Sequence, residues 1–388
     1  MRKNSSKLSY FLSQPHQPFF AAGVINAIIF MLVFLLSFKG VATLNITPNS
    51  FHAYSMIFIV FTPFFQGFLL TTYPRFNQFP PLEQNIYTTN FTLLFGGTIL
   101  FLLGAFTWSG FLYAGMFLLF GNQLYTFYLF YQIYKVSASP DKHDQFWILL
   151  SFGAGVVANL IFIIALAVNS GILEEFAKKS AVYLYLIFVA LSVGQRMIPF
   201  FSHVMVDKND KILKTIFILF FLGVVTDISA YPYGFAFYYI GGIFLAKEIY
   251  RWKLPFKKAE PILWILHLAI FWLPGGLLIG SLLDMAAVIM HKDFLFLGLH
   301  LVVLGFVLTV LIGFGTRVTL GHSGNLMIID NLTKALFYMT QIVIYMRLLY
   351  SFTATGFLFD LSVLLWIALF GAWSYKYMPI LLFGKKIS

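Results

Sequence analysis

Long runs of apolar residues separated by short polar connections dominate this chain. A helix needs about 20 apolar residues to cross the hydrocarbon core of a bilayer, and twelve runs of about that length are present. They cover residues 19–38, 51–73, 91–107, 110–134, 146–168, 180–198, 212–228, 231–249, 261–285, 294–315, 332–350 and 354–381. Prolines such as Pro48, Pro74 and Pro199 lie at the breaks, as turn-forming residues do. The pattern predicts an all-α polytopic membrane protein of twelve transmembrane helices, in one domain over residues 1–388.

The composition supports this prediction and excludes most other classes. The chain is 60% apolar and 10% charged, whereas a soluble domain is about 45–50% apolar and about 25% charged. It contains no cysteine, which excludes disulfides, iron–sulfur clusters and thiolate-ligated haem. The net charge is +11, but the positive residues lie between the apolar runs. They therefore indicate a lipid bilayer as partner and not a nucleic acid.

The distribution of positive charge predicts the orientation. With the amino terminus in the cytoplasm, 20 of the 25 Lys and Arg residues lie on the cytoplasmic side, as the positive-inside rule requires. Twelve spans then leave both termini in the cytoplasm. The first apolar run, Phe19–Phe38, is long for a signal-peptide core and no small-residue cleavage site follows it. We therefore expect it to be a retained helix.

Three arginines suggest an internal repeat. Arg75, Arg196 and Arg317 end the second, sixth and tenth runs at a constant spacing of 121 residues. This spacing is consistent with three arcs of four helices. Helical hairpins of ordinary length would produce similar spacing, so this alternative stays open.

Ionisable residues inside membrane spans are costly and mark functional sites, and two histidines draw attention for this reason. His52 opens the second run, and His300 lies six residues into the tenth. Two imidazoles at similar depth suit a haem with two histidine ligands. Alternatively, both histidines hydrogen-bond interfacial water. Arg347 ends the eleventh run, where it either pairs with a haem propionate or anchors the helix at the interface.

A second group of polar residues is expected at the cytoplasmic side. Its members are His16, His267, His322, Arg196 and Arg317. The three imidazoles suit copper, or they cap helix ends and pair with carboxylates. This group is separate from the first, because 22 helical residues between His300 and His322 span about 33 Å. Asp284, an isolated carboxylate, is a candidate proton or cation site of a transporter.

Five short segments occur in an order that is typical of one family. They are Pro15-His-Gln-Pro-Phe-Phe20, Gln66-Gly-Phe-Leu-Leu-Thr-Thr-Tyr-Pro74, Gln195-Arg-Met-Ile-Pro-Phe-Phe201, Leu266-His267 with Trp272, and Leu299-His300 followed by Thr316-Arg-Val-Thr-Leu-Gly-His-Ser-Gly324. The set resembles the NnrS-type membrane proteins, which contain haem and copper and are linked to the bacterial nitric-oxide response. The chain departs from that family at Tyr54, because His52-Ala-Tyr-Ser-Met56 stands where the family often has His-Ala-His-Glu-Met.

The resemblance implies a protein of the bacterial cytoplasmic (inner) membrane. Haem b ligated by His52 and His300, copper as a second metal, nitric oxide or another small diatomic ligand and an unknown electron donor would follow from it. A more distant similarity to the large subunit of haem–copper oxidases gives the same two ligand positions. The copper site of those enzymes is absent, because the sixth and seventh runs contain no membrane-embedded histidine. A secondary transporter, a haem or copper carrier for the assembly of other enzymes and a nitric-oxide reductase remain alternatives.

Overall fold

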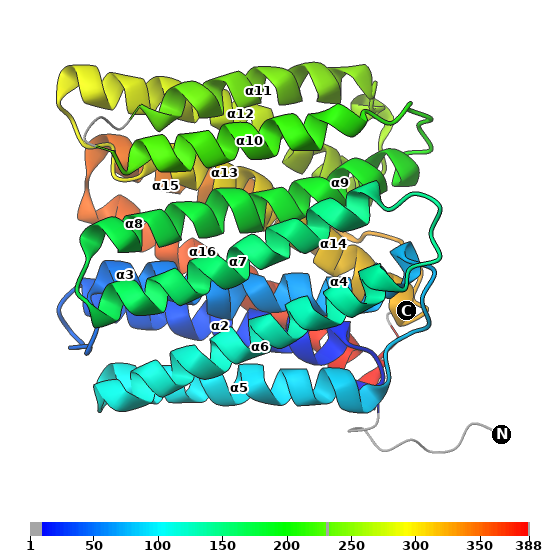
Figure 1. Ribbon diagram of the computed structural model, residues 1–388, viewed down its shortest axis with the longest axis horizontal. Helices are drawn as coiled ribbons and strands as arrows, with labels where there is room; N and C mark the ends of the chain where they lie inside the picture. The colour runs from blue at the N-terminus through cyan, green and yellow to red at the C-terminus, as the bar shows by residue number, and fades with distance from the viewer. Residues whose placement is uncertain (1–9, 230–232, 387–388) are drawn as a thin grey trace. The chain divides into compact units, whose positions relative to one another are not determined.

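Helices make up the regular structure of the computed structural model, which describes residues 10–229 and 233–386 (Figure 1). Twelve rods follow one another along the chain, and three of them combine two α-helices with a π-helix between them. The single-helix rods are α2 His16–Phe38, α5 Gln84–Phe106, α6 Ser109–Lys135, α7 His143–Ala167, α10 Asp210–Asp227, α11 Gly234–Arg251, α12 Pro261–Met290, α15 Asn331–Thr353 and α16 Gly356–Phe383. The composite rods are α3 Pro48–Tyr54, η1 Ser55–Phe61 and α4 Thr62–Phe76; α8 Gly171–Ser180, η2 Ala181–Ile187 and α9 Phe188–Phe201; and α13 Leu297–Val302, η4 Val303–Leu308 and α14 Thr309–His322. A short 3-10 turn, η3 Phe256–Lys258, precedes α12.

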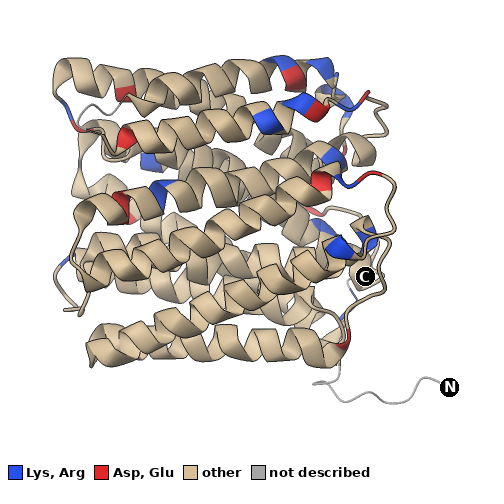
Figure 2. Ribbon diagram, in the orientation of Figure 1, with Lys and Arg blue, Asp and Glu red and all other residues tan. Residues whose placement is uncertain are grey.

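The prediction of an all-α membrane protein is confirmed. Among the described residues, 9 of the rods are long and apolar enough to cross a membrane. The other three are α6, which is rich in tyrosine and side-chain amides, and α10 and α11, which carry several charged residues. Charged residues lie mainly near the ends of individual helices, and the middles of the helices are free of them (Figure 2). The exact number of spans stays a prediction.

The chain divides into two compact units. Unit 1 comprises residues 1–178, 315–327 and 367–388, and unit 2 comprises residues 179–314 and 328–366. The prediction of a single domain stays a prediction, and each unit is described below by itself.

Close glycine contacts hold the α5–α6 hairpin of unit 1 together, and the two helices lie side by side in Figure 1. A Cβ atom on Gly104 would overlap the backbone of Leu112, and one on Gly115 would overlap the backbone of Phe101. Small residues allow such an approach, which lets helices associate in lipid through van der Waals contact. The glycines therefore determine how α5 and α6 pair.

Buried side-chain amides connect three helices of unit 1. Asn122 of α6 donates to the backbone carbonyl of Asn90 at 2.8 Å and to its Oδ1 at 2.6 Å, and accepts from Gln66 Nε2 of α4 at 2.7 Å. Thr126 Oγ1 accepts from Gln66 and from Asn90 at 2.9 and 2.7 Å. All four residues are buried. Because lipid offers no alternative partner, such bonds stabilise helix association.

The three π-helices recur at nearly constant spacing. They begin at Ser55, Ala181 and Val303, in the second, sixth and tenth rods, which are the rods that Arg75, Arg196 and Arg317 end. These rods are also the most buried, with 94%, 83% and 89% of their apolar windows inside the protein, against 33–61% for the other candidate spans. This regularity agrees with the repeat that the arginine spacing suggests.

Candidate functional site

His52 lies in the short helix that leads into the first π-helix. The helix begins at Pro48, and its cap is Thr47, whose Oγ1 accepts a hydrogen bond from the Ser50 backbone N–H at 3.2 Å. His52 lies three residues before the π-helix, and its ring packs on Phe34 with centroids 4.1 Å apart. π-Helices are often found at functional sites.

His300 has the same place relative to the third π-helix. It lies three residues before Val303, in α13 of unit 2. Its Nδ1 is 2.9 Å from the carbonyl oxygen of Phe296. Donation from Nδ1 to a carbonyl leaves the Nε2 lone pair for a metal, an arrangement that is usual for metal-ligating histidines.

The second π-helix has a different residue at this position. Lys178 lies three residues before Ala181 and pairs with Glu175 and, at 3.3 Å, with Glu174. Lys178 is therefore paired with two carboxylates of its own helix. A histidine therefore precedes the first and third π-helices, and a salt-bridged lysine precedes the second.

The first residue after the π-helix is a threonine in the second and tenth rods, which are the two rods with the histidine. Thr62 Oγ1 donates to the Ile57 carbonyl at 2.8 Å, and Thr309 Oγ1 donates to the Leu304 carbonyl at 3.3 Å. Each bond reaches five residues back, from the residue that follows the π-helix to a carbonyl inside it. The equivalent residue of the middle copy is Phe188, which has no hydroxyl.

Arg347 lies beside His300 in unit 2. Its Nη2 is 2.7 Å from the Leu295 carbonyl and 3.4 Å from His300 Nδ1, and its Nη1 donates to Ser351. The guanidinium also lies over the ring of Tyr350, with 5.1 Å to the centroid. These contacts bind α15 to the segment that precedes α13 and place a positive charge next to the imidazole.

His16 and His322 come together in unit 1. Their ring centroids are 4.8 Å apart, and His322 Nδ1 is 2.7 Å from Gln14 Oε1. His16 is 2% exposed, and its Nδ1 has no hydrogen-bond partner in the described part of the chain. Arg75 is within electrostatic range of both imidazoles. Sequence reasoning included neither Gln14 nor Arg75 in this cluster, although the repeated arginine spacing was a signal for Arg75.

The other expected members of this cluster are divided between the two units. His267 belongs to unit 2, where its Nε2 is 2.6 Å from Ser202 Oγ and its Nδ1 has no hydrogen-bond partner among residues 10–229 and 233–386. Arg196 lies in α9 of unit 2 and Arg317 in α14 of unit 1. No group of three or more His, Cys, Asp or Glu side chains with metal-binding geometry occurs within the described residues.

Tyr54, which stands where the family often has a histidine, is fully buried in unit 1. Its hydroxyl donates to Asn159 Oδ1 at 3.1 Å, and Asn159 Nδ2 donates to Gln123 Oε1 at 3.0 Å. Its ring stacks on Phe101 with centroids 5.1 Å apart. Tyr54 therefore connects the second rod to α7 through a hydrogen bond, as a structural residue does.

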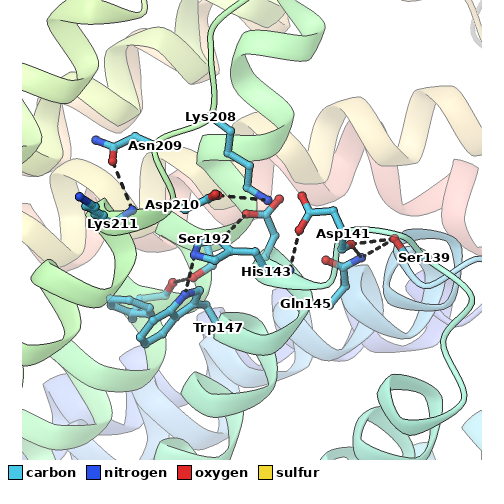
Figure 3. A network of polar contacts seen from close by, with 12 residues as sticks. Ser139, Asp141, His143, Gln145, Trp147, Ser192, Lys208, Asn209, Asp210 and Lys211 are labelled. Carbon is cyan, nitrogen blue, oxygen red and sulfur yellow. Dashed lines mark hydrogen bonds and ion pairs between the residues drawn. The ribbon is translucent and has the colours of Figure 1, made fainter.

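A further polar network surrounds the start of α7 (Figure 3). Nε2 of His143 accepts from Trp147 Nε1 at 3.2 Å, and the His143 backbone N–H donates to Asp141 Oδ1 at 2.9 Å. Gln145 Nε2 donates to the Asp141 carbonyl at 3.0 Å and to Ser139 Oγ at 3.3 Å. These bonds close the connection before α7, and the Asp141 carboxylate accepts from the first backbone N–H of that helix.

The fold and these positions define a helical membrane protein with histidines in its buried rods. A family model described as NnrS protein matches residues 10–383 of the chain. The chain therefore belongs to the NnrS family, which confirms the family expected from the ordered motifs. No curated protein matches the chain.

Proposed function

We propose that this protein is a haem-binding membrane protein of the bacterial nitric-oxide response, with His52 and His300 as ligands of haem b. Membership of the NnrS family supports the link to nitric oxide. The observation that carries the ligand assignment is the repeat, since both histidines lie three residues before a π-helix. When bound, the haem supplies an iron for electron transfer or for nitric oxide or another small diatomic ligand. The proposal includes an electron donor that reduces the haem iron.

The residues around His300 fit this role. Nδ1 of His300 faces the Phe296 carbonyl at 2.9 Å, so the ring is oriented with Nε2 as the ligand nitrogen. Arg347 supplies a positive charge beside the imidazole, which suits a propionate carboxylate through a charge-assisted bond. The rings of Phe34 and His52 pack 4.1 Å apart, an apolar contact that orients the second ligand.

Optical spectroscopy of the detergent-purified protein tests the assignment. The wild type is expected to show a Soret band with sharp bands after dithionite reduction, at about one haem per chain. His52→Ala and His300→Ala are each expected to lose the six-coordinate spectrum. Lys178→Ala, the equivalent position in the middle copy, is the matched control and should keep it.

Three results would each contradict part of the proposal. A protein that stays colourless after expression with haem supplied favours the secondary transporter, for which substrate uptake lost in Asp284→Ala is the evidence. A wild-type spectrum in both histidine variants refutes the ligand assignment. A haem protein that does not react with nitric oxide is instead a carrier for the assembly of other enzymes.

For copper, we propose a site at His16 and His322. The unpartnered, buried Nδ1 of His16 beside a second imidazole fits copper, for which imidazole is a suitable ligand. The charge of nearby Arg75 favours the singly charged ion, because repulsion scales with charge. Copper per chain, measured by mass spectrometry, should fall in His16→Ala and His322→Ala and not in His203→Ala. Equal copper in all four proteins contradicts this site.

The orientation is also part of the proposal. We expect both termini on the cytoplasmic side of the inner membrane, because this assigns 20 of 25 Lys and Arg residues to that side. Terminal fusions to a reporter that fluoresces only in the cytoplasm should be fluorescent, and dark fusions would contradict the orientation.

A further inference from the structure

Basic side chains gather at one end of unit 2, where α10 begins and α11 ends (Figure 2). Residues 203–214 and 247–260 hold eight Lys or Arg and four Asp or Glu. Six of the basic residues are exposed lysines that we call the lysine patch: Lys211, Lys214, Lys247, Lys253, Lys257 and Lys258. The lysine patch has no part in the proposed haem or copper sites.

A hydrogen bond between the two segments fixes how these lysines come together. Asn209, which caps α10, donates through Nδ2 to Glu248 Oε2 in the last turn of α11 at 2.8 Å. The two helices form an antiparallel hairpin. Lys211, two residues after Asn209, therefore lies near the level of Lys247, one residue before Glu248. Two lysines from different helices thus belong to one surface.

The acids at this end leave the lysine patch uncompensated. Glu248 accepts from Arg251 through both of its oxygens, and Asp210 Oδ1 lies 3.9 Å from Lys208 Nζ. The ammonium groups of the lysine patch make no hydrogen bond or ion pair with residues 10–229 or 233–386. Since the two other acids cannot balance six lysines, this surface carries net positive charge.

Helix stability does not explain where two of these lysines lie. Lys211 and Lys214 occupy the first turns of α10, which begins at Asp210. The amino terminus of a helix carries partial positive charge, so cations there are unfavourable. Like charges gathered on one surface also repel one another. An anion bound from outside the protein offsets both costs.

Large apolar side chains are exposed at the same end of unit 2. Met205, in the connection before α10, is 100% exposed, and Tyr250, in the last turn of α11, is 84% exposed. Aromatic rings and lysines with long apolar stems are typical of the boundary between hydrocarbon and headgroups. The partner of this surface therefore combines negative charge with apolar chains, as an anionic phospholipid does.

We propose that the lysine patch binds the phosphate headgroups of anionic phospholipids in the leaflet that this end of unit 2 faces. With the orientation proposed above, this is the cytoplasmic leaflet. Clusters of about 4–8 Lys or Arg beside membrane helices recognise anionic lipids. Each ammonium group offers three N–H donors to phosphate oxygens. Binding is non-covalent and requires neither haem nor copper.

Native mass spectrometry of the detergent-solubilised full chain, titrated with phosphatidylglycerol, tests this surface. The wild type is expected to bind phosphatidylglycerol more tightly than phosphatidylcholine with the same acyl chains. The triple variant Lys211→Gln, Lys214→Gln, Lys247→Gln should bind phosphatidylglycerol about a hundredfold more weakly at low salt, because each lysine near an anionic surface contributes a factor of about five. Added salt should weaken binding to the wild type through screening.

A second triple variant, Lys135→Gln, Lys334→Gln, Lys385→Gln, is the matched control. These exposed lysines lie outside the lysine patch, and their removal changes the net charge equally. Circular dichroism first checks that both variants are folded, and the control should then keep the affinity of the wild type.

Three results overturn the proposal. Equal weakening in both triple variants shows that net charge alone attracts the lipid. Equal affinity of the wild type for the two lipids excludes an anionic headgroup and leaves an acidic protein as the partner of the lysine patch. Loss of lipid binding when inorganic phosphate is added at equal concentration assigns the patch to free phosphate. These outcomes are independent of the optical spectrum that tests haem.

Discussion

The buried amide network of unit 1 permits a quantitative test. Asn122 makes three side-chain hydrogen bonds to other helices, two to Asn90 at 2.8 and 2.6 Å and one from Gln66 at 2.7 Å. Hydrogen bonds between transmembrane helices contribute about 0.6 kcal/mol each on average. We therefore expect Asn122→Leu, which keeps the number and branching of the side-chain heavy atoms, to lower the free energy of unfolding by about 2 kcal/mol. This corresponds to a factor of about 30 in the folding equilibrium constant.

Unfolding in mixed micelles of increasing SDS mole fraction, followed by tryptophan fluorescence, measures this loss. The control is Thr92→Val on the exposed part of α5, where the hydroxyl donates only within its own helix, to the Thr88 carbonyl at 2.9 Å. The control should unfold near the wild type, and Asn122→Leu should unfold at lower SDS. If the two variants have the same stability, the amides do not couple the helices.

Three more changes test other contacts. Gly104→Ala should destabilise the α5–α6 hairpin by about 1–3 kcal/mol through overpacking. Gly121→Ala is the control, because Gly121 has open space around it. Equal thermal midpoints of the two variants would contradict the close contact at Gly104. Ser202→Ala removes the buried contact to His267 and should cost about 1–3 kcal/mol, and an unchanged midpoint would exclude that bond. Arg347→Leu should speed hydrogen exchange in the segment before α13. Unaltered exchange would show that the contacts of Arg347 do not stabilise this segment.

The fold class could be predicted from the sequence with little ambiguity. Apolar runs of about 20 residues exclude a soluble fold, and lipid requires their backbone groups to bond within a helix. The positions of the breaks followed only in part from local chemistry. Pro48 begins a helix as expected, but the expectation for Pro74 and Pro199 was wrong, because both lie inside the last turns of α4 and α9. Less predictable was the start of the sixth rod, which begins at Gly171, nine residues before the run predicted at 180–198.

The candidate site was only partly predictable. The sequence singled out His52, His300 and Arg347, and the contact between Arg347 and His300 depends on side chains 47 positions apart. The π-helices could not be foreseen, because a wide turn has no residue signature and depends on packing around the rod. Their constant offset from the two histidines is the strongest support for the ligand assignment.

The helical membrane class and the family follow from the sequence alone, which also supplied the candidate site residues. These properties depend on composition, on run length and on motifs that each lie within a short stretch of chain. Tertiary structure decided the partners: His16 with His322, His267 with Ser202, and Lys179 with Asp227. Hydrogen bonds and electrostatic contacts act over a few ångströms, so only the packing of helices far apart in the sequence selects which of these side chains meet.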